Sequence, residues 1–113
     1  LWIHDGELLV GNSGDGYLKR IDLETGAMTN VFSIGAGILD GIRVDQSGNL
    51  LVSRWGGELY RVQPDGSVTE ILDGETQGWT IADLVFLPGV GLVLFPTFFV
   101  NRVRAVRIGD GGG

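Results

Sequence analysis

The chain has 113 residues, a net charge of −6 and no cysteine. Its length suits a single domain, and a hydrophobic content of 43% indicates a packed core rather than a disordered chain. The acidic charge, without a basic stripe, argues against nucleic-acid binding, and the lack of cysteine excludes disulfides, zinc–thiolate sites and thiol nucleophiles. No apolar run approaches the roughly 20 residues of a membrane-spanning helix.

Residues 1–34 predict a first unit of short strands. The strand "ELLVG" follows Gly6, "YLKRID" follows the turn "GNSGDG", and the edge-like strand "AMTNVFS" follows a Thr-Gly turn. Valine and isoleucine greatly outnumber alanine, and apolar and polar residues alternate along these segments, which is typical of strands. The turn "GNSGDG" lacks the order of acidic residues found in a calcium loop, so we expect a hairpin turn there.

Residues 35–77 repeat the same order of elements. The segments "NLLVS", "ELYRVQ" and "SVTEIL" correspond to three strands of the first unit, and Gly48 lies 42 residues after Gly6. Asp45 and Asp65 fall between strands, where Asp commonly bonds the backbone of a turn. We expect structural roles for both.

Residues 78–108 begin a third copy. Gly91 lies 43 residues after Gly48, and the strands "GLVLF" and "NRVRAVRI" follow in the expected order, without a fourth strand. Residues 109–113, "GDGGG", predict a flexible tail. Because the chain opens in mid-pattern without a methionine, we expect a piece of a longer protein, a processed product or an engineered product.

Four strands repeated at about 42 residues are the dimensions of a β-propeller blade. A β-sandwich also uses short strands and turns, but it does not require a fixed repeat. We therefore predict an all-β propeller fragment of about 2.7 four-stranded antiparallel blades, whereas closed propellers have about four to eight. Such an arc should expose strand edges and apolar faces, so the expected partners are other propeller blades, from a longer chain or from further copies.

The middle unit, "DGIRVDQSGNLLVSRWGGELYRVQPDG", resembles the characteristic blade of the regucalcin/gluconolactonase (senescence marker protein-like) family of six-bladed propellers. That blade runs Pro-Asp-Gly, an apolar strand, Asp-x-x-Gly-Asn-Leu, a second apolar strand, Trp-or-Asn-Gly-Gly and then Arg with Asp-Gly. This sequence departs from the pattern at Leu39, which replaces the usual proline. The opening and closing segments are similar to neighbouring blades of the family. The resemblance implies a six-bladed parent ring and metal-dependent hydrolysis of a small lactone or ester.

Asp40 is the residue on which this functional prediction depends. The resemblance implies that Asp40 lines the central channel and binds a divalent metal in the complete ring, commonly calcium, with zinc or magnesium as alternatives. Reasoning from the residues alone, inner strands that share a channel bring their leading carboxylates together, where Asp40 could serve as metal ligand or as general base. The alternative is that Asp40 caps a turn through nearby backbone N–H groups. The family's other ligands would lie upstream of Leu1.

Three more residues are weaker candidates for the channel lining. Asp83 lies 43 residues after Asp40 and is expected to face the same channel, with turn capping as its alternative role. Arg54 could bind an anionic substrate, and Trp55 could stack on a sugar or a lactone. The alternative for Trp55 is packing between blades.

Two other features predict structure rather than chemistry. His4, the only histidine, lies in a turn-like segment without a nucleophile motif, so we expect it to be exposed and not catalytic. The segment "FPTFF", residues 95–99, predicts inter-blade core with a bulge at Pro96.

Two other classes of function stay open because a fold does not determine function. One is a non-catalytic propeller scaffold that binds a protein or a carbohydrate. The other is a fragment that assembles into a ring without activity. The compartment also stays open: a soluble protein of the bacterial periplasm, a secreted protein and a cytoplasmic protein all fit the sequence.

Overall fold

The computed structural model describes residues 1–33, 39–74, 78–97, 99 and 101–108. These residues form eleven strands in three antiparallel sheets and no helix. The flexible tail predicted at residues 109–113 lies outside the described residues. The described part of the chain contains no helix long and apolar enough to cross a membrane.

Each sheet follows the chain from one edge to the other, as a propeller blade does. The first sheet contains β1 (Trp2–His4), β2 (Glu7–Asn12), β3 (Tyr17–Asp22) and β4 (Met28–Ser33). The second contains β5 (Leu39–Val44), β6 (Leu50–Arg54), β7 (Glu58–Val62) and β8 (Val68–Asp73). The third contains β9 (Val85–Leu87), β10 (Leu92–Thr97) and β11 (Arg102–Arg107). The sheets lie within residues 1–34, 35–77 and 78–108.

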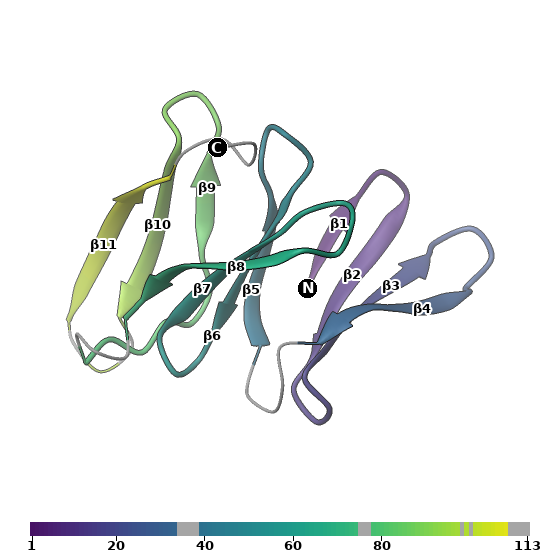
Figure 1. Cartoon of the computed structure of the whole chain (residues 1–113), viewed down its shortest axis with the longest axis horizontal. Coiled ribbons are helices and arrows are strands. Elements are labelled where there is room, and N and C mark those ends of the chain that lie inside the picture. The colour runs from purple at the N-terminus through teal and green to yellow at the C-terminus, as the bar shows by residue number, and fades with distance from the viewer. Residues whose placement is uncertain (34–38, 75–77, 98, 100, 109–113) are drawn as a thin grey trace.

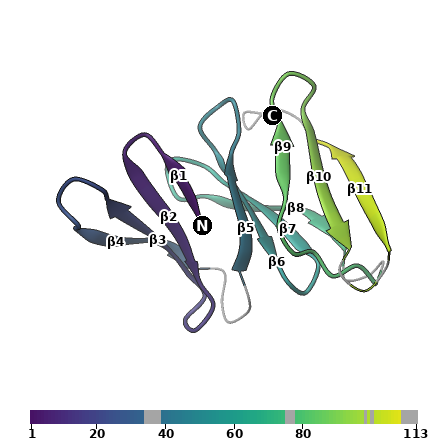
Figure 2. The ribbon, with the colours of Figure 1, turned by 180° about the vertical axis from the view of Figure 1, so that it is seen from behind.

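The three sheets fan out side by side (Figure 1). Their first strands are neighbours: β5 lies between β1 and β9, and it contacts both (Figure 2). The later strands of each sheet extend away from this inner row. This is the arrangement of consecutive blades around a shared axis, so the all-β propeller prediction is confirmed.

The glycines that mark the repeat have a conformational reason. Gly6, Gly48 and Gly91 have φ angles of 76°, 84° and 65° and lie in the turns after the first strand of each sheet. This left-handed conformation is costly for residues with a Cβ atom. The turn "GNSGDG" joins β2 to β3 as the expected hairpin, closed by the bond from Gly16 N to Asn12 O at 2.9 Å.

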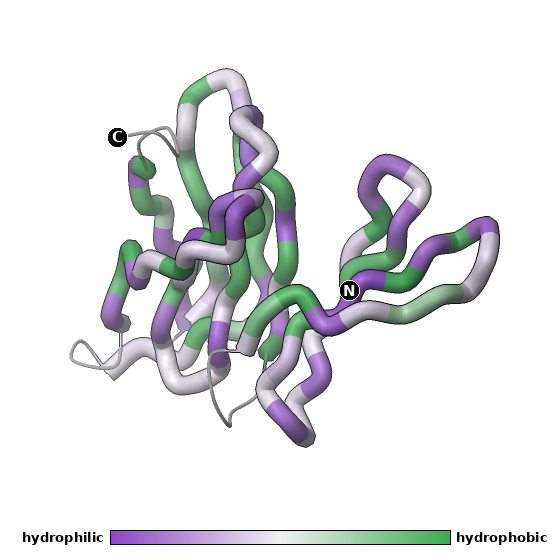
Figure 3. Tube along the Cα trace, turned by 45° about the vertical axis from the view of Figure 1, so that its right-hand side comes forward, coloured by the Kyte–Doolittle hydropathy of each residue, from purple (hydrophilic) through white to green (hydrophobic). Residues whose placement is uncertain are grey.

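Side chains alternate along β6 and so build two separate cores. Leu50 and Val52 point into the core between the first and second sheets, whereas Leu51 points into the core between the second and third. Figure 3 shows apolar residues running through the strands, with polar residues in most of the turns. A two-layer sandwich would bury one face of each sheet. Here the second sheet is covered on both faces, which excludes the sandwich alternative.

The outward faces of the first and third sheets are apolar and exposed. In the third sheet, Val85 and Val103 are 42% and 72% exposed. In the first sheet, a cross-strand row of apolar residues includes Ile3 and Met28, which are 62% and 60% exposed. Exposed apolar faces of this kind are typical of interaction surfaces.

The predicted bulge at Pro96 is wrong. The register between β10 and β11 is continuous from Leu92, opposite Arg107, to Thr97, opposite Arg102. Phe95 is 1% exposed, so the core prediction is confirmed for that residue, whereas Pro96 is exposed, Phe99 is 77% exposed and Phe98 lies outside the described residues. Pro96 lies beyond residues 92–94, the part of β10 that pairs with β9, so the missing N–H of proline removes no hydrogen bond to β9.

Candidate functional site

Residues from all three sheets meet where the inner strands lie side by side. The guanidinium carbon of Arg43, in β5, lies 4.1 Å from the centre of a Trp2 ring in β1. Arg43 Nη1 also lies 3.7 Å from Asp83 Oδ1, just before β9, and donates to the Ile42 carbonyl at 2.7 Å. The Arg43 side chain is only 16% exposed. We call Trp2, Asp40, Arg43 and Asp83 the inner-strand cluster.

Asp40 lies in the irregular part of β5, where the register against β6 shifts between Leu39 and Ile42. Such a bulge re-aims a side chain relative to its neighbours. Burial, and secondarily the negative charge of Asp83, raise the pKa of the Asp40 carboxyl above its ordinary value of 3.8. Among the described residues, Asp40 has no hydrogen bond to a turn, so the capping role considered for it is not seen there.

Gly41 and Ser53 hold β5 against the segment that precedes β9. Ser53 Oγ accepts a hydrogen bond from Gly41 N at 2.8 Å and donates one to the Ala82 carbonyl at 2.6 Å. A Cβ atom on Gly41 would lie 2.8 Å from Leu84 N and 2.9 Å from both Asp83 Oδ1 and Ser53 Oγ. The glycine after Asp40 is therefore required by close packing, and this packing brings Asp40 and Asp83 near each other.

Asp83 combines two contacts. Its Oδ1 atom accepts a hydrogen bond from Leu84 N at 2.8 Å, as a capping residue does, and lies near Arg43. The ladder shows that Asp83 is not the register equivalent of Asp40: Ile81 pairs with Thr97 as Leu39 pairs with Arg54, so Ala82 corresponds to Asp40. The repeat spacing at this point is 42 residues, one fewer than we expected.

Arg54 and Trp55 lie at the end of β6 and in the turn that follows. Arg54 hydrogen-bonds the hydroxyl of Tyr60, whose pKa is raised mainly by burial. Trp55 packs edge-on against Phe99, with ring centres 6.2 Å apart and an interplanar angle of 82°. This contact joins the second sheet to the third and matches the inter-blade alternative for Trp55.

The described residues do not form a complete metal site. They contain no group of three or more His, Cys, Asp or Glu side chains arranged to hold an ion. Calcium takes about six to eight oxygen ligands, and this cluster offers two carboxylates, one of them beside a guanidinium. The chain by itself therefore does not fit the metal that the family resemblance implies.

The sequence analysis missed Arg43, Trp2 and Ser53. Arg43 lies in the segment "GIRVD", which we treated as an apolar strand; a charged residue inside a buried inner strand was the signal available. Trp2 and Ser53 gave no such signal, because their roles depend on contacts between sheets. A hollow of about 320 Å³ adjoins Arg43 and Asp83 and extends over the apolar outward face of the third sheet.

No protein-family model matches the sequence, and no curated protein matches it. Solved structures do match the fold. A streptogramin B lyase aligns with a TM-score of 0.58 and 11% identity over 94% of this chain. Two structures of virginiamycin B lyase from Staphylococcus aureus, a catalytically inactive form with quinupristin and a selenomethionine-substituted form, align with TM-scores of 0.61 and 0.63, 14% and 15% identity, and 95% coverage. The chain spans 38–39% of the length of these proteins, and the likeness establishes the propeller fold alone.

Proposed function

We propose that this chain forms part of a β-propeller enzyme that hydrolyses a small lactone or ester at the inner-strand cluster. The observation that carries the proposal is the environment of Asp40: a partly buried carboxyl whose pKa is raised by burial and by the charge of Asp83, which in turn lies 3.7 Å from the Arg43 guanidinium. Perturbed carboxyls of this kind concentrate at functional sites. The regucalcin/gluconolactonase resemblance of the middle blade supports the same position and the same class of reaction.

Each charged residue of the cluster has a chemical role in this proposal. Asp40 accepts the proton of the water molecule that attacks the carbonyl carbon, because a raised pKa makes its carboxylate a better base. Arg43 stabilises the negative charge that develops on the carbonyl oxygen. Asp83 positions Arg43 through their contact at 3.7 Å. Arg54 and Trp55 are more distant candidates for binding the rest of the substrate.

The complete site requires further blades. The exposed apolar faces of the first and third sheets support packing against additional blades, from a longer chain or from other copies. In a complete ring, a divalent cation, with calcium as the first candidate, would polarise the substrate carbonyl. Asp40 is the residue of this chain proposed as its ligand.

The proposal is tested with the complete propeller and a panel of small lactones and aryl esters. We expect Asp40→Asn to lower kcat/KM about 100-fold, because a positioned base contributes about that much or more. The control Asp65→Asn changes a turn carboxylate away from the cluster and should leave the rate unchanged. Unchanged activity in Asp40→Asn would rule out Asp40 as the base.

Two further measurements define the chemistry. Calorimetric titration with calcium and with zinc, on wild type and Asp40→Ala, reports whether the ring binds a cation through Asp40. The structural neighbours are lyases, so the products must also be identified. Hydrolysis adds the elements of water to the opened ring, whereas elimination does not, and an elimination product would replace hydrolysis by a lyase reaction.

A further inference from the structure

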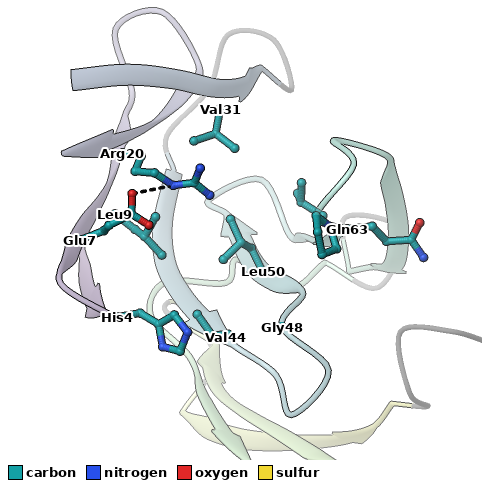
Figure 4. Close-up of a pocket in the computed structure, with 11 residues that line it drawn as sticks. His4, Glu7, Leu9, Arg20, Val31, Val44, Gly48, Leu50 and Gln63 are labelled. Atoms are coloured by element: carbon teal, nitrogen blue, oxygen red, sulfur yellow. Dashed lines mark ion pairs between the residues drawn. The ribbon is translucent and has the colours of Figure 1, made fainter. Parts of the chain in front are cut away.

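A second hollow, of about 320 Å³, lies between the first and second sheets and shares no lining residue with the inner-strand cluster (Figure 4). It is lined by His4 at the end of β1, Val44 at the end of β5 and Gly48 in the following turn. Asp40 is at the opposite end of β5. Because both walls of this hollow belong to sheets of this chain, the site does not depend on further blades.

The hollow has an apolar floor and a charged wall. Leu9 and Leu50, which are 3% and 8% exposed, form part of the floor. Glu7 and Arg20 stand on the wall contributed by the first sheet (Figure 4). Its volume is at the lower end of the range for pockets that bind small molecules, about 300–1,000 Å³.

Arg20 and Glu7 are paired but retain binding capacity. Arg20 Nε lies 3.3 Å from Glu7 Oε2. Within the described part of the chain, this is the one ion pair of Arg20, so its two terminal nitrogens and the other oxygen of Glu7 keep their hydrogen-bonding capacity. Figure 4 shows the guanidinium reaching from the wall toward the hollow.

The second sheet places the equivalent arginine in a different environment. Arg61 faces Leu51 across the ladder as Arg20 faces Leu9, so the two arginines occupy equivalent positions. The Arg61 side chain is 9% exposed and lies 3.7 Å from Asp45, which is 3% exposed.

The first sheet has no counterpart of that buried acid. The ladder places His4 where the second sheet has Asp45, since Ile3 pairs with Leu8 as Val44 pairs with Leu50. The Arg20 side chain accordingly stays 43% exposed at the edge of the hollow. The Arg20–Glu7 pair therefore stays accessible beside the apolar floor of the hollow, whereas the Arg61–Asp45 pair is buried.

We propose that this hollow binds a small zwitterion with an apolar side chain, the chemistry of a free apolar α-amino acid. The terminal nitrogens of Arg20 form a planar fork that matches a carboxylate. Glu7 accepts the neighbouring ammonium, and Leu9 and Leu50 cover the side chain. A simple anion fits less well, because Glu7 and the net charge of −6 repel it.

Leucine is the probe, and three analogues test each part of the recognition. N-acetylleucine lacks the ammonium, leucinamide lacks the carboxylate, and glycine lacks the apolar side chain. We expect leucine to bind in the millimolar range or tighter and each analogue to bind about tenfold more weakly. N-acetylleucine and leucinamide each lose a charged hydrogen bond, and glycine loses the burial of an apolar side chain. His4 is the only histidine, so its ring signals in NMR spectra report binding at this hollow without ambiguity.

Two variants test the named residues. Arg20→Lys keeps the charge but loses the fork, and Glu7→Gln keeps the shape but loses the charge; both should weaken leucine binding about tenfold. Arg107→Lys, the same exchange at an exposed arginine of the third sheet, should bind leucine as wild type does. Melting curves show whether each variant is folded. If a variant does not fold, the comparison of leucine with its three analogues on wild type tests the proposed binding.

Three results would overturn the proposal: no shift of the His4 signals with millimolar leucine, equal binding of leucine and N-acetylleucine, or binding that both variants leave unchanged. Loss in Arg20→Lys and Glu7→Gln with retention in Arg107→Lys supports it. Because the hollow and the inner-strand cluster share no residue, failure here leaves the hydrolase proposal intact, and failure of hydrolysis leaves this one intact.

Discussion

The carboxyl group of Asp40 is held in an environment that opposes its ionisation. Burial and the charge of Asp83 raise its pKa, and no described residue donates a hydrogen bond to it. A group whose pKa is raised by folding makes the folded state less stable when it ionises. Groups that destabilise the folded state in this way are common where a residue is retained for function rather than for stability.

Because the pKa shift of Asp40 is upward, it predicts how Asp40→Asn changes the free energy of unfolding at each pH. Below the ordinary pKa of 3.8 the carboxyl is protonated in both the folded and the unfolded chain, and wild type and variant should be equally stable. As the pH rises, the unfolded chain ionises first, so wild type loses stability until the folded pKa is passed. At neutral pH the variant should be more stable by about half a kcal/mol or less, because the group is partly solvated. Urea unfolding of wild type and Asp40→Asn, at a pH below 3.8 and at neutral pH, measures this difference in the free energy of unfolding.

Asp65→Asn is the control. Folding lowers the pKa of Asp65, so its contribution to stability depends on pH in the opposite direction to that of Asp40. Hydrogen bonds from the Ser67 side chain and from Ser67 N, the latter at 2.8 Å, lower the pKa of the Asp65 carboxyl. Its contribution to stability is therefore present above the unfolded pKa and lost as the pH falls through the folded one. An Asp40→Asn variant that is less stable than wild type at neutral pH would contradict our description of the site.

At the level of elements, the site depends on how closely β5 approaches the segment before β9. Gly41→Ala places a Cβ atom within 2.9 Å of Asp83 Oδ1 and 2.8 Å of Leu84 N. We expect a loss of about 1–3 kcal/mol in the free energy of unfolding, as for other overpacked positions. Gly89→Ala, where nothing lies within 4 Å of the added atom, should change stability by less than about 0.5 kcal/mol. Equal effects of the two substitutions in denaturant unfolding would show that the sheets are not in contact there.

The sequence predicted the elements better than the contacts between them. Gly6, Gly48 and Gly91 marked the turns correctly because a positive φ is a local requirement that one residue satisfies. The cation–π contact of Arg43 with Trp2 depends on neighbouring sheets, which no local pattern encodes. Asp83 was placed one register position away from where it lies, because the third sheet has one more residue than the second in the turn between its first two strands: Val44 pairs with Leu50, whereas Phe86 pairs with Val93.

At the level of the whole molecule, the exposed faces of the first and third sheets predict association. The 113-residue chain alone should form dimers or larger species at micromolar concentration, measured by analytical ultracentrifugation. Val103→Lys puts a charge on the outward face of the third sheet, where Val103 is 72% exposed, and should weaken association about tenfold or more. Thr69→Lys adds the same charge to an exposed position of the second sheet and should have no effect. A cooperatively folded monomer would show that the faces are stable in water.

The central claim is that successive sheets share an axis and thereby bring Asp40 and Asp83 together at the inner strands. NMR titration of the Asp40 carboxyl carbon, in wild type and in Asp83→Asn, tests this most directly. We predict a midpoint above 3.8 in wild type that falls in the variant while staying above 3.8, because burial, the larger cause, persists. A midpoint at or below 3.8, or one that Asp83→Asn leaves unchanged, would contradict the claim.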